Sequence, residues 1–348
     1  MDIRRDLLDL PRALRETLEK GGPEYDKLVR QTRWGDGPLY VVASGAALAA
    51  GLAGAYAFET LVGLPTVVRG SADFHAYSLS ALRPRSILLA IADSGESTDT
   101  LELLRAAKSR GATVLALTSD ARGELAKEAE GVFLVRAGEE HSGSLKADVC
   151  RQAAACYLGF VAARALKRPH AHLRDLEEEF PKLPEHIEWA LSQLSEAVRP
   201  FASELKSASR VYVAGGGFYH ASALHGTTAM RKLAGTDACA FNALEPEIQH
   251  YGPRERGASV ILLSGSHCRS KKRIHALAEG EMRAGTRILA VTDRNDPELS
   301  RRSALAILLP VLSEEVGSLV SLALLDWVAY HAGRERSGEK TRALTGQP

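Results

Sequence analysis

The chain has 348 residues, of which 45% are apolar and 25% charged, the composition of an ordinary globular protein with room for two domains. Its net charge of +1 creates no global field that would recruit nucleic acid or an anionic membrane, so we expect neither as a partner. The N-terminus carries charges where a signal peptide needs an apolar core, and we therefore expect a cytoplasmic protein.

The first predicted strand ends in a glycine turn. The apolar run that begins at Leu39 reaches Ser44 and Gly45, two small residues typical of a turn between a strand and a helix. Apolar residues continue to Val62, but three glycines and Glu59 interrupt them. We interpret this stretch as a buried strand, turn and helix and not as a membrane span.

The next predicted strand, Ile87–Ile91, leads into a loop rich in hydroxyl groups. The loop reads Asp93-Ser94-Gly95-Glu96-Ser97-Thr98 and precedes the helical run Leu101–Ala107. Free N–H groups of a first helical turn, the helix dipole and nearby hydroxyls favour a bound phosphate, and a glycine lets the backbone approach it closely. The loop lacks the lysine of a nucleoside-triphosphate loop, which favours a monophosphate. The alternative is an ordinary helix cap.

The second half of the chain repeats this pattern. An offset of 172 residues, which drifts by two along the chain, pairs the strand and turn at Leu39 with Val211, Ser86 with Ser259, and Gly111 with Gly285. The predicted strands are nearly continuous apolar runs, as expected of parallel strands that helices cover on both faces. We therefore predict an α/β protein with two doubly wound parallel-sheet units in tandem.

The repeat also predicts the domain boundaries. We expect an N-terminal helix over residues 1–24, a first domain over 25–168, a linker with an opening helix over 169–209, a second domain over 210–335, and a tail over 336–348.

Four segments carry a resemblance to a known family: the glycine turn at 43–51, the hydroxyl-rich loop at 93–100, the segment 137–147, and Glu247-Ile248-Gln249-His250-Tyr251-Gly252-Pro253. Together they resemble the sugar isomerase (SIS) domain family in its tandem form. The last segment is similar to a Glu-x-x-His-Gly-Pro stretch of that family, with Tyr251 inserted.

The resemblance implies a sugar-phosphate site in the first domain. The implied phosphate and sugar contacts are Ser44, Gly45, Asp93, Ser94, Gly95, Ser97, Thr98 and Ser144. His250 would open the sugar ring, a role that suits an imidazole because it titrates near neutrality. The resemblance further implies a homodimer. No cluster of His, Cys and Asp has the spacing of metal ligands, so we expect no metal, and we expect no cofactor.

The chain departs from the family at the base for proton transfer. The family's lysine position falls on Ala229, and its glutamate position falls on or near Lys232. Lys232, Glu245, Glu247 and His225 therefore stay open as candidates for that role. For the two glutamates the alternative is an ordinary solvated loop acid. For His250 it is a surface or core histidine that a backbone carbonyl satisfies.

Two further alternatives remain open. The chain is expected to be a phosphosugar isomerase, deaminase or deglycase that acts on a 6-phosphorylated sugar, or else a sensor that binds a phosphosugar without turnover. The second half's counterpart of the phosphate loop, residues 264–270, lacks the Gly-Glu-Ser-Thr core. Either it has degenerated, which we favour, or it binds a second anion through Ser266, Arg269 and Lys271.

Overall fold

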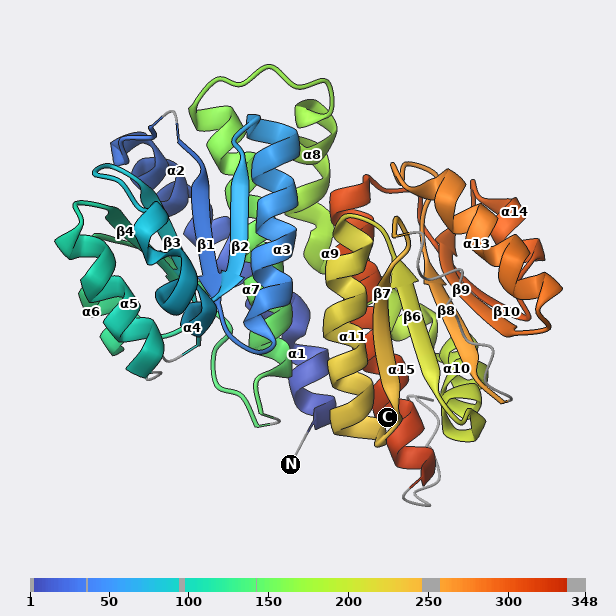
Figure 1. Cartoon of the computed structure of the whole chain (residues 1–348). Helices are drawn as coiled ribbons and strands as arrows, with labels where there is room; N and C mark the ends of the chain where they lie inside the picture. Colours follow the sequence, from blue (N-terminus) through green and yellow to red (C-terminus); the bar gives the residue numbers. More distant parts are fainter. Residues whose placement is uncertain (1–2, 36, 94–97, 142, 246–256, 337–348) are drawn as a thin grey trace, which may run out of the picture. The chain divides into compact units, whose positions relative to one another are not determined.

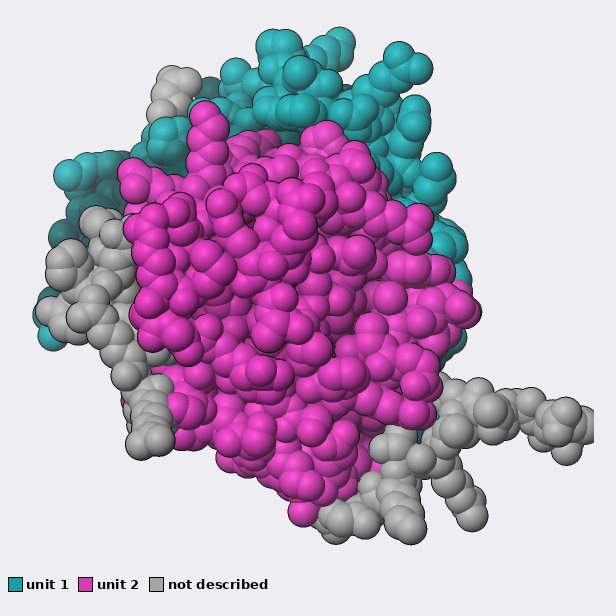
Figure 2. Space-filling view, turned by 90° about the vertical axis from the view of Figure 1, so that its right-hand side faces the viewer, with its two compact units in different colours: residues 1–186 teal, residues 187–348 magenta. Residues whose placement is uncertain are grey.

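The computed structural model describes residues 3–35, 37–93, 98–141, 143–245 and 257–336. The chain divides into two units between His186 and Ile187 (Figure 2). This division lies inside the segment 169–209, which we expected to join two domains, and that segment is largely helical.

The first unit opens with helices and continues as alternating strands and helices (Figure 1). Its elements are α1 Ile3–Arg15, α2 Gly21–Gln31, β1 Leu39–Ala43, α3 Ala47–Ala57, β2 Thr66–Gly70, α4 Ser71–Asp73, β3 Ile87–Ile91, α5 Thr98–Ser109, β4 Thr113–Thr118, α6 Glu124–Glu128, β5 Gly131–Leu134, α7 Leu145–Ala165, α8 Leu173–Glu179 and α9 Leu183–Gln193, the last of which runs into the second unit. A π-helical turn joins α1 to α2, so the opening helix does not end near residue 24 as expected.

The sheet of the first unit is parallel, in the order β2-β1-β3-β4-β5. Helices α3 and α7 pack together on one face, while α4, α5 and α6 lie on the other (Figure 1). On the α5 face, Val42, Leu88 and Val114 from the three central strands form a core with Leu103 and Leu104 of α5. Burial on both faces explains why the central strands are continuous apolar runs.

The second unit has the same kind of alternation. Its elements are α10 Ser195–Ser207, β6 Val211–Gly215, α11 Phe218–Ala234, β7 Ala238–Asn242, β8 Ser259–Leu263, α13 Lys271–Arg283, β9 Arg287–Asp293, α14 Pro297–Arg301, β10 Leu305–Leu309 and α15 Glu314–Arg336. The strand order, β7-β6-β8-β9-β10, matches that of the first unit position by position. The predicted fold class is therefore confirmed.

Helix α15 is the one described helix that is long and apolar enough to cross a membrane. Its most apolar window is 89% buried, and the helix packs along α11 and α10. Its apolar character is accounted for by this packing, as in the central helix of a folded core.

Candidate functional site

In the sheet of the first unit, β2 lies on one side of β1 and β3 lies on the other. The strand order therefore reverses its direction at β1, which places a switch point between β1 and β3. The two strands are in register at their last residues, with Ala43 opposite Ile91. The turn after β1 and the loop after β3 therefore leave the sheet at the same level. In open parallel α/β sheets, ligands bind in the crevice at this place.

The turn after β1 leaves space at the crevice. Ser44 is exposed, and Gly45 has φ +58°, a left-handed conformation that favours glycine. A side chain at Gly45 would meet no atom of the described residues within 4 Å. No described residue therefore fills the space next to Gly45.

The structure describes the residues on either side of the loop after β3. The hydroxyl of Thr118, at the end of β4, donates to the carbonyl of Asp93, and Thr98 begins α5 with its side chain exposed. Ser94, Gly95 and Ser97 lie outside the described residues. The expected phosphate contacts that the structure describes, Ser44, Gly45, Asp93 and Thr98, flank the crevice.

A buried ion pair on α7 connects the remaining predicted contact, Ser144, to this loop. The Ser144 hydroxyl lies 3.2 Å from Oδ2 of Asp148 and donates to it. Oδ1 of Asp148 accepts from Nη1 of Arg151, and Nη2 of Arg151 lies 3.0 Å from Oδ1 of Asp93. The structure thus brings Ser144 and Asp93 together through two residues that the sequence analysis did not identify.

Arg151 is the notable member of this chain of contacts. Its side chain is 3% exposed, and neither Nε nor Nη2 has a partner of hydrogen-bond geometry among the described residues. A buried guanidinium that lacks part of its hydrogen bonding is costly, and a bound anion would reduce that cost. Its signal in the sequence is a pair of opposite charges, Asp148 and Arg151, three residues apart in a mostly apolar helix.

A carboxylate of the first unit also compensates the positive end of the helix dipole at the start of α7. Glu140 accepts from the N–H groups of Lys146 (2.7 Å) and Ala147 (3.3 Å), which places a carboxylate at the helix N-terminus. Burial raises the pKa of Glu140, although these two hydrogen bonds oppose the shift. The buried Lys146 ammonium donates to Asp9 at 2.8 Å. These contacts fix the position of Ser144, which caps the helix with φ +77°.

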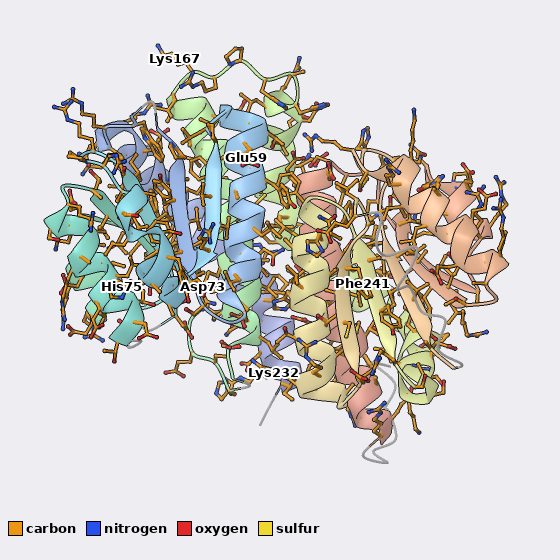
Figure 3. The ribbon with its side chains drawn as sticks, in the orientation of Figure 1. Glu59, Asp73, His75, Lys167, Lys232 and Phe241 are labelled. Atoms are coloured by element: carbon orange, nitrogen blue, oxygen red, sulfur yellow. The ribbon has the colours of Figure 1, made fainter. Side chains whose placement is uncertain are left out.

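The candidates for proton transfer lie in the second unit, in very different surroundings. His225 is 2% exposed and lies within α11, where its Nε2 is 3.0 Å from both carboxylate oxygens of Asp326 on α15. Lys232 is exposed in the last turn of α11 (Figure 3). Glu247 and His250 lie outside the described residues. Of the four, His225 has the environment of a core histidine, buried against its carboxylate partner.

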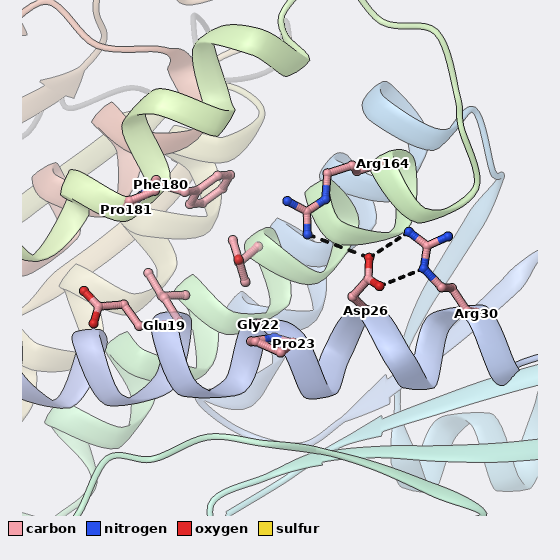
Figure 4. Close-up of a pocket in the computed structure, with 10 residues that line it drawn as sticks. Glu19, Gly22, Pro23, Asp26, Arg30, Arg164, Phe180 and Pro181 are labelled. Atoms are coloured by element: carbon pink, nitrogen blue, oxygen red, sulfur yellow. Dashed lines mark hydrogen bonds and ion pairs between the residues drawn. The ribbon is translucent and has the colours of Figure 1, made fainter.

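The first unit also contains a cavity of about 550 Å³. It lies between α2, the last turns of α7 and the segment at Phe180, where Asp26 contacts both Arg30 and Arg164 (Figure 4). Arg164 is 13 residues beyond Arg151 on the same helix, roughly 20 Å away at 1.5 Å per residue. This cavity is therefore separate from the crevice at the switch point.

The SIS domain family model matches residues 36–160, which include β1 to β5 and most of α7. Over these residues the first unit is similar to the SIS domain family. The described part of the crevice lies beside the glycine turn after β1 and the loop after β3. These are two of the segments on which the resemblance was based. The resemblance to the tandem SIS proteins is confirmed by the relatives described next.

Curated relatives are similar over most of the chain. A glutamine–fructose-6-phosphate aminotransferase (isomerizing) from Methanothermobacter thermautotrophicus is 29% identical over 85% of the chain and 48% of its own length. The protein of the same description from Thermococcus kodakarensis is 27% identical over 98% of the chain and 56% of its own length. The chain thus spans about half the length of the curated relatives it matches.

Solved structures share the fold of both units. The C-terminal domain of glucosamine-fructose-6-phosphate aminotransferase from Francisella tularensis superposes with a TM-score of 0.84 at 18% identity, covering 96% of each chain. Glucosamine-6-phosphate deaminase from Thermotoga maritima superposes with a TM-score of 0.70 at 15% identity, covering 97% of this chain and 95% of its own. At these identities the likeness is one of fold.

Proposed function

We propose that the chain is an enzyme that acts on a 6-phosphorylated sugar, as an aldose–ketose isomerase, an amino-sugar phosphate isomerase or a deglycase. The observation that carries this proposal is the buried connection from Ser144 through Asp148 and Arg151 to Asp93. It couples the residue expected to contact the sugar to the loop expected to hold the phosphate. The names of the relatives support the same substrate class.

The proposed reaction begins with anchoring of the phosphate at residues 94–98, at the N-terminus of α5. Arg151, behind Asp93, would hold the loop in place and add positive potential to the crevice. His250 would donate a proton to the ring oxygen as its bond to the anomeric carbon breaks, while the anomeric hydroxyl gives up its proton. Proton transfer between C1 and C2 would follow.

A sensor that binds without turnover is the second candidate, and one observation favours it. Lys232 stands on or near the family's glutamate position, and an exposed ammonium cannot replace a carboxylate base. His225 is already engaged by Asp326. In either case we propose a homodimer in the cytoplasm, with no nucleic acid or membrane as partner.

A thermal-shift screen followed by a turnover assay tests these candidates. Because a ligand that binds only the folded state raises the melting midpoint, fructose 6-phosphate and glucosamine 6-phosphate should raise it and their unphosphorylated parents should not. The shift should disappear in S94A/S97A. Turnover that falls by about a hundredfold or more in H250A, with the thermal shift retained, indicates an enzyme. A shift without turnover in the wild type indicates a sensor, and no shift with any compound contradicts both.

A further inference from the structure

The second unit has its own switch point, between β6 and β8, built like that of the first. Gly217 follows β6 with φ +58°, the same value as Gly45, and it lies 172 residues further along the chain. The segment 264–270 follows β8, as the phosphate loop follows β3. The two units therefore have a glycine turn and a loop at corresponding places in the sheet.

In the second unit, backbone N–H groups of the segment 264–270 already donate to carboxylates of the chain itself. The N–H of Arg269 donates to Oε2 of Glu314 at 3.3 Å, and Nη1 of Arg269 donates to the same oxygen at 2.6 Å. The N–H and the hydroxyl of Ser266 donate to Oδ2 of Asp293 at 2.6 and 2.9 Å. Glu315 lies 3.3 Å from the guanidinium of Arg269.

The glycine turns show the same contrast between the units. A side chain at Gly45 would enter space that no described residue fills, whereas one at Gly217 would lie 3.3 Å from Oε1 of Glu314. At the neighbouring Gly216, a side chain would clash with Ser270 of the loop. The crevice of the second unit is thus filled where the described part of the first is open.

Glu314 is held in this place at an electrostatic cost. It is 3% exposed, and burial raises its pKa although Arg269 lowers it. Burial also raises the pKa of Cys268 to about 11, so this thiol stays protonated and can donate to Glu314, 3.5 Å away. The Glu314 carboxylate thus accepts hydrogen bonds from an arginine, a loop N–H and a thiol. A bound oxyanion would have the same kind of environment.

We propose that the second unit retains an oxyanion site whose occupant is the carboxylate of Glu314, and that replacing Glu314 and Glu315 opens it to inorganic phosphate. The second unit of the wild-type chain then has no open site for a phosphorylated ligand. The guanidinium and the backbone N–H of Arg269 supply the donors of the opened site, and Asp293 remains in place on Ser266. This inference concerns the second unit alone and does not depend on the proposed reaction.

Titration of inorganic phosphate by calorimetry tests the proposal, with every variant built on S94A/S97A so that the first unit is silent. With both glutamates intact we expect no saturable binding up to ~10 mM, and in E314A/E315A we expect one saturable site at least tenfold tighter than this limit. Adding R269M should abolish that site. The control E279A frees another arginine, Arg283, from its glutamate on exposed α13 and should bind no phosphate.

The isosteric E314Q/E315Q serves if the alanine variant does not fold, and it should also gain the site. Two results would overturn the proposal. One is saturable phosphate binding by the S94A/S97A chain with both glutamates present, provided that R269M removes it. The other is a folded glutamate-free variant that binds no phosphate.

Discussion

Arg151 shows how one side chain can link two segments of the first unit that we expect to contact the ligand. It is buried together with Asp148, and its second terminal nitrogen reaches Asp93 beside the phosphate loop. Breaking a buried ion pair from one side leaves an uncompensated charge, which costs more than removing both partners. The pair should therefore affect both stability and ligand binding.

We predict that Arg151→Met lowers the free energy of unfolding by about 3 kcal/mol, because Asp148 then stays buried without its partner. The double variant D148N/R151M should recover part of this loss. Both variants should bind a sugar phosphate about tenfold more weakly than the wild type, since Asp93 loses its cation. Chemical denaturation and calorimetry measure the two effects. A single variant as stable as the double would show that the pair is not coupled as described.

His220, in the first turn of α11, gives a prediction about pH. Burial lowers its pKa from the ordinary value of 6.5, although the Phe241 carbonyl and Glu245 oppose the shift. The unfolded chain therefore takes up a proton at this residue more readily than the folded one, so stability falls as the pH drops through 6.5 toward the folded-state pKa.

In H220Q the loss of stability between about pH 7.5 and pH 5.5 should be smaller than in the wild type. Denaturant unfolding at several pH values measures the slope. An equal slope in the wild type and H220Q would contradict the assignment.

At the scale of single residues, the sequence predicted the positions around the crevice better than the contacts between them. Ser44, Gly45, Asp93 and Thr98 were identified because a strand, a small residue and a helix start leave a clear local pattern. Arg151 was not identified, because its role depends on the folded α7 crossing the end of β3. Local patterns carry no information about such a crossing.

At the scale of elements, the six central strands were predicted and the four edge strands were not. The central strands β1, β3 and β6 are buried at every residue, so they are continuous apolar runs. The edge strands β2 and β7 are mostly half-buried and carry polar residues, so their pattern resembles that of a loop. The tandem sheets could be inferred from the central strands alone, since each edge strand only extends them.

The packing of α3 against α7 gives a prediction at this scale. A side chain at Gly159 on α7 would lie 2.5 Å from Cβ and 2.9 Å from the carbonyl carbon of Ala57 on α3, so the helices would have to separate. We predict that Gly159→Ala lowers the free energy of unfolding by about 1–3 kcal/mol.

The matched control is Gly280→Ala on α13, where a side chain would meet no described atom within 4 Å. There alanine should stabilise the protein by about 0.5–1 kcal/mol, because it restricts the unfolded chain and favours the helix. Equal effects of the two substitutions in denaturant unfolding would mean that the close approach of α3 and α7 does not limit the side chain at Gly159.

At the scale of the whole molecule, the two units have the same strand order but differ at their switch points. In the first unit the described part of the crevice is open at Gly45, and in the second Glu314 fills it. One fold thus has an open glycine turn in one unit and a glycine turn closed by Glu314 in the other. The sequence left this difference open, because the closing carboxylate comes from α15, more than forty residues after the loop that it closes.

The most direct measurement of the central claim is calorimetric titration of the wild-type chain with fructose 6-phosphate and with fructose. We predict saturable binding of the phosphorylated sugar at one site per chain, no binding of fructose at the same concentrations, and loss of the site in S94A/S97A. Equal binding of both sugars, or binding of the phosphorylated sugar that survives in S94A/S97A, would contradict a phosphate site in the first unit.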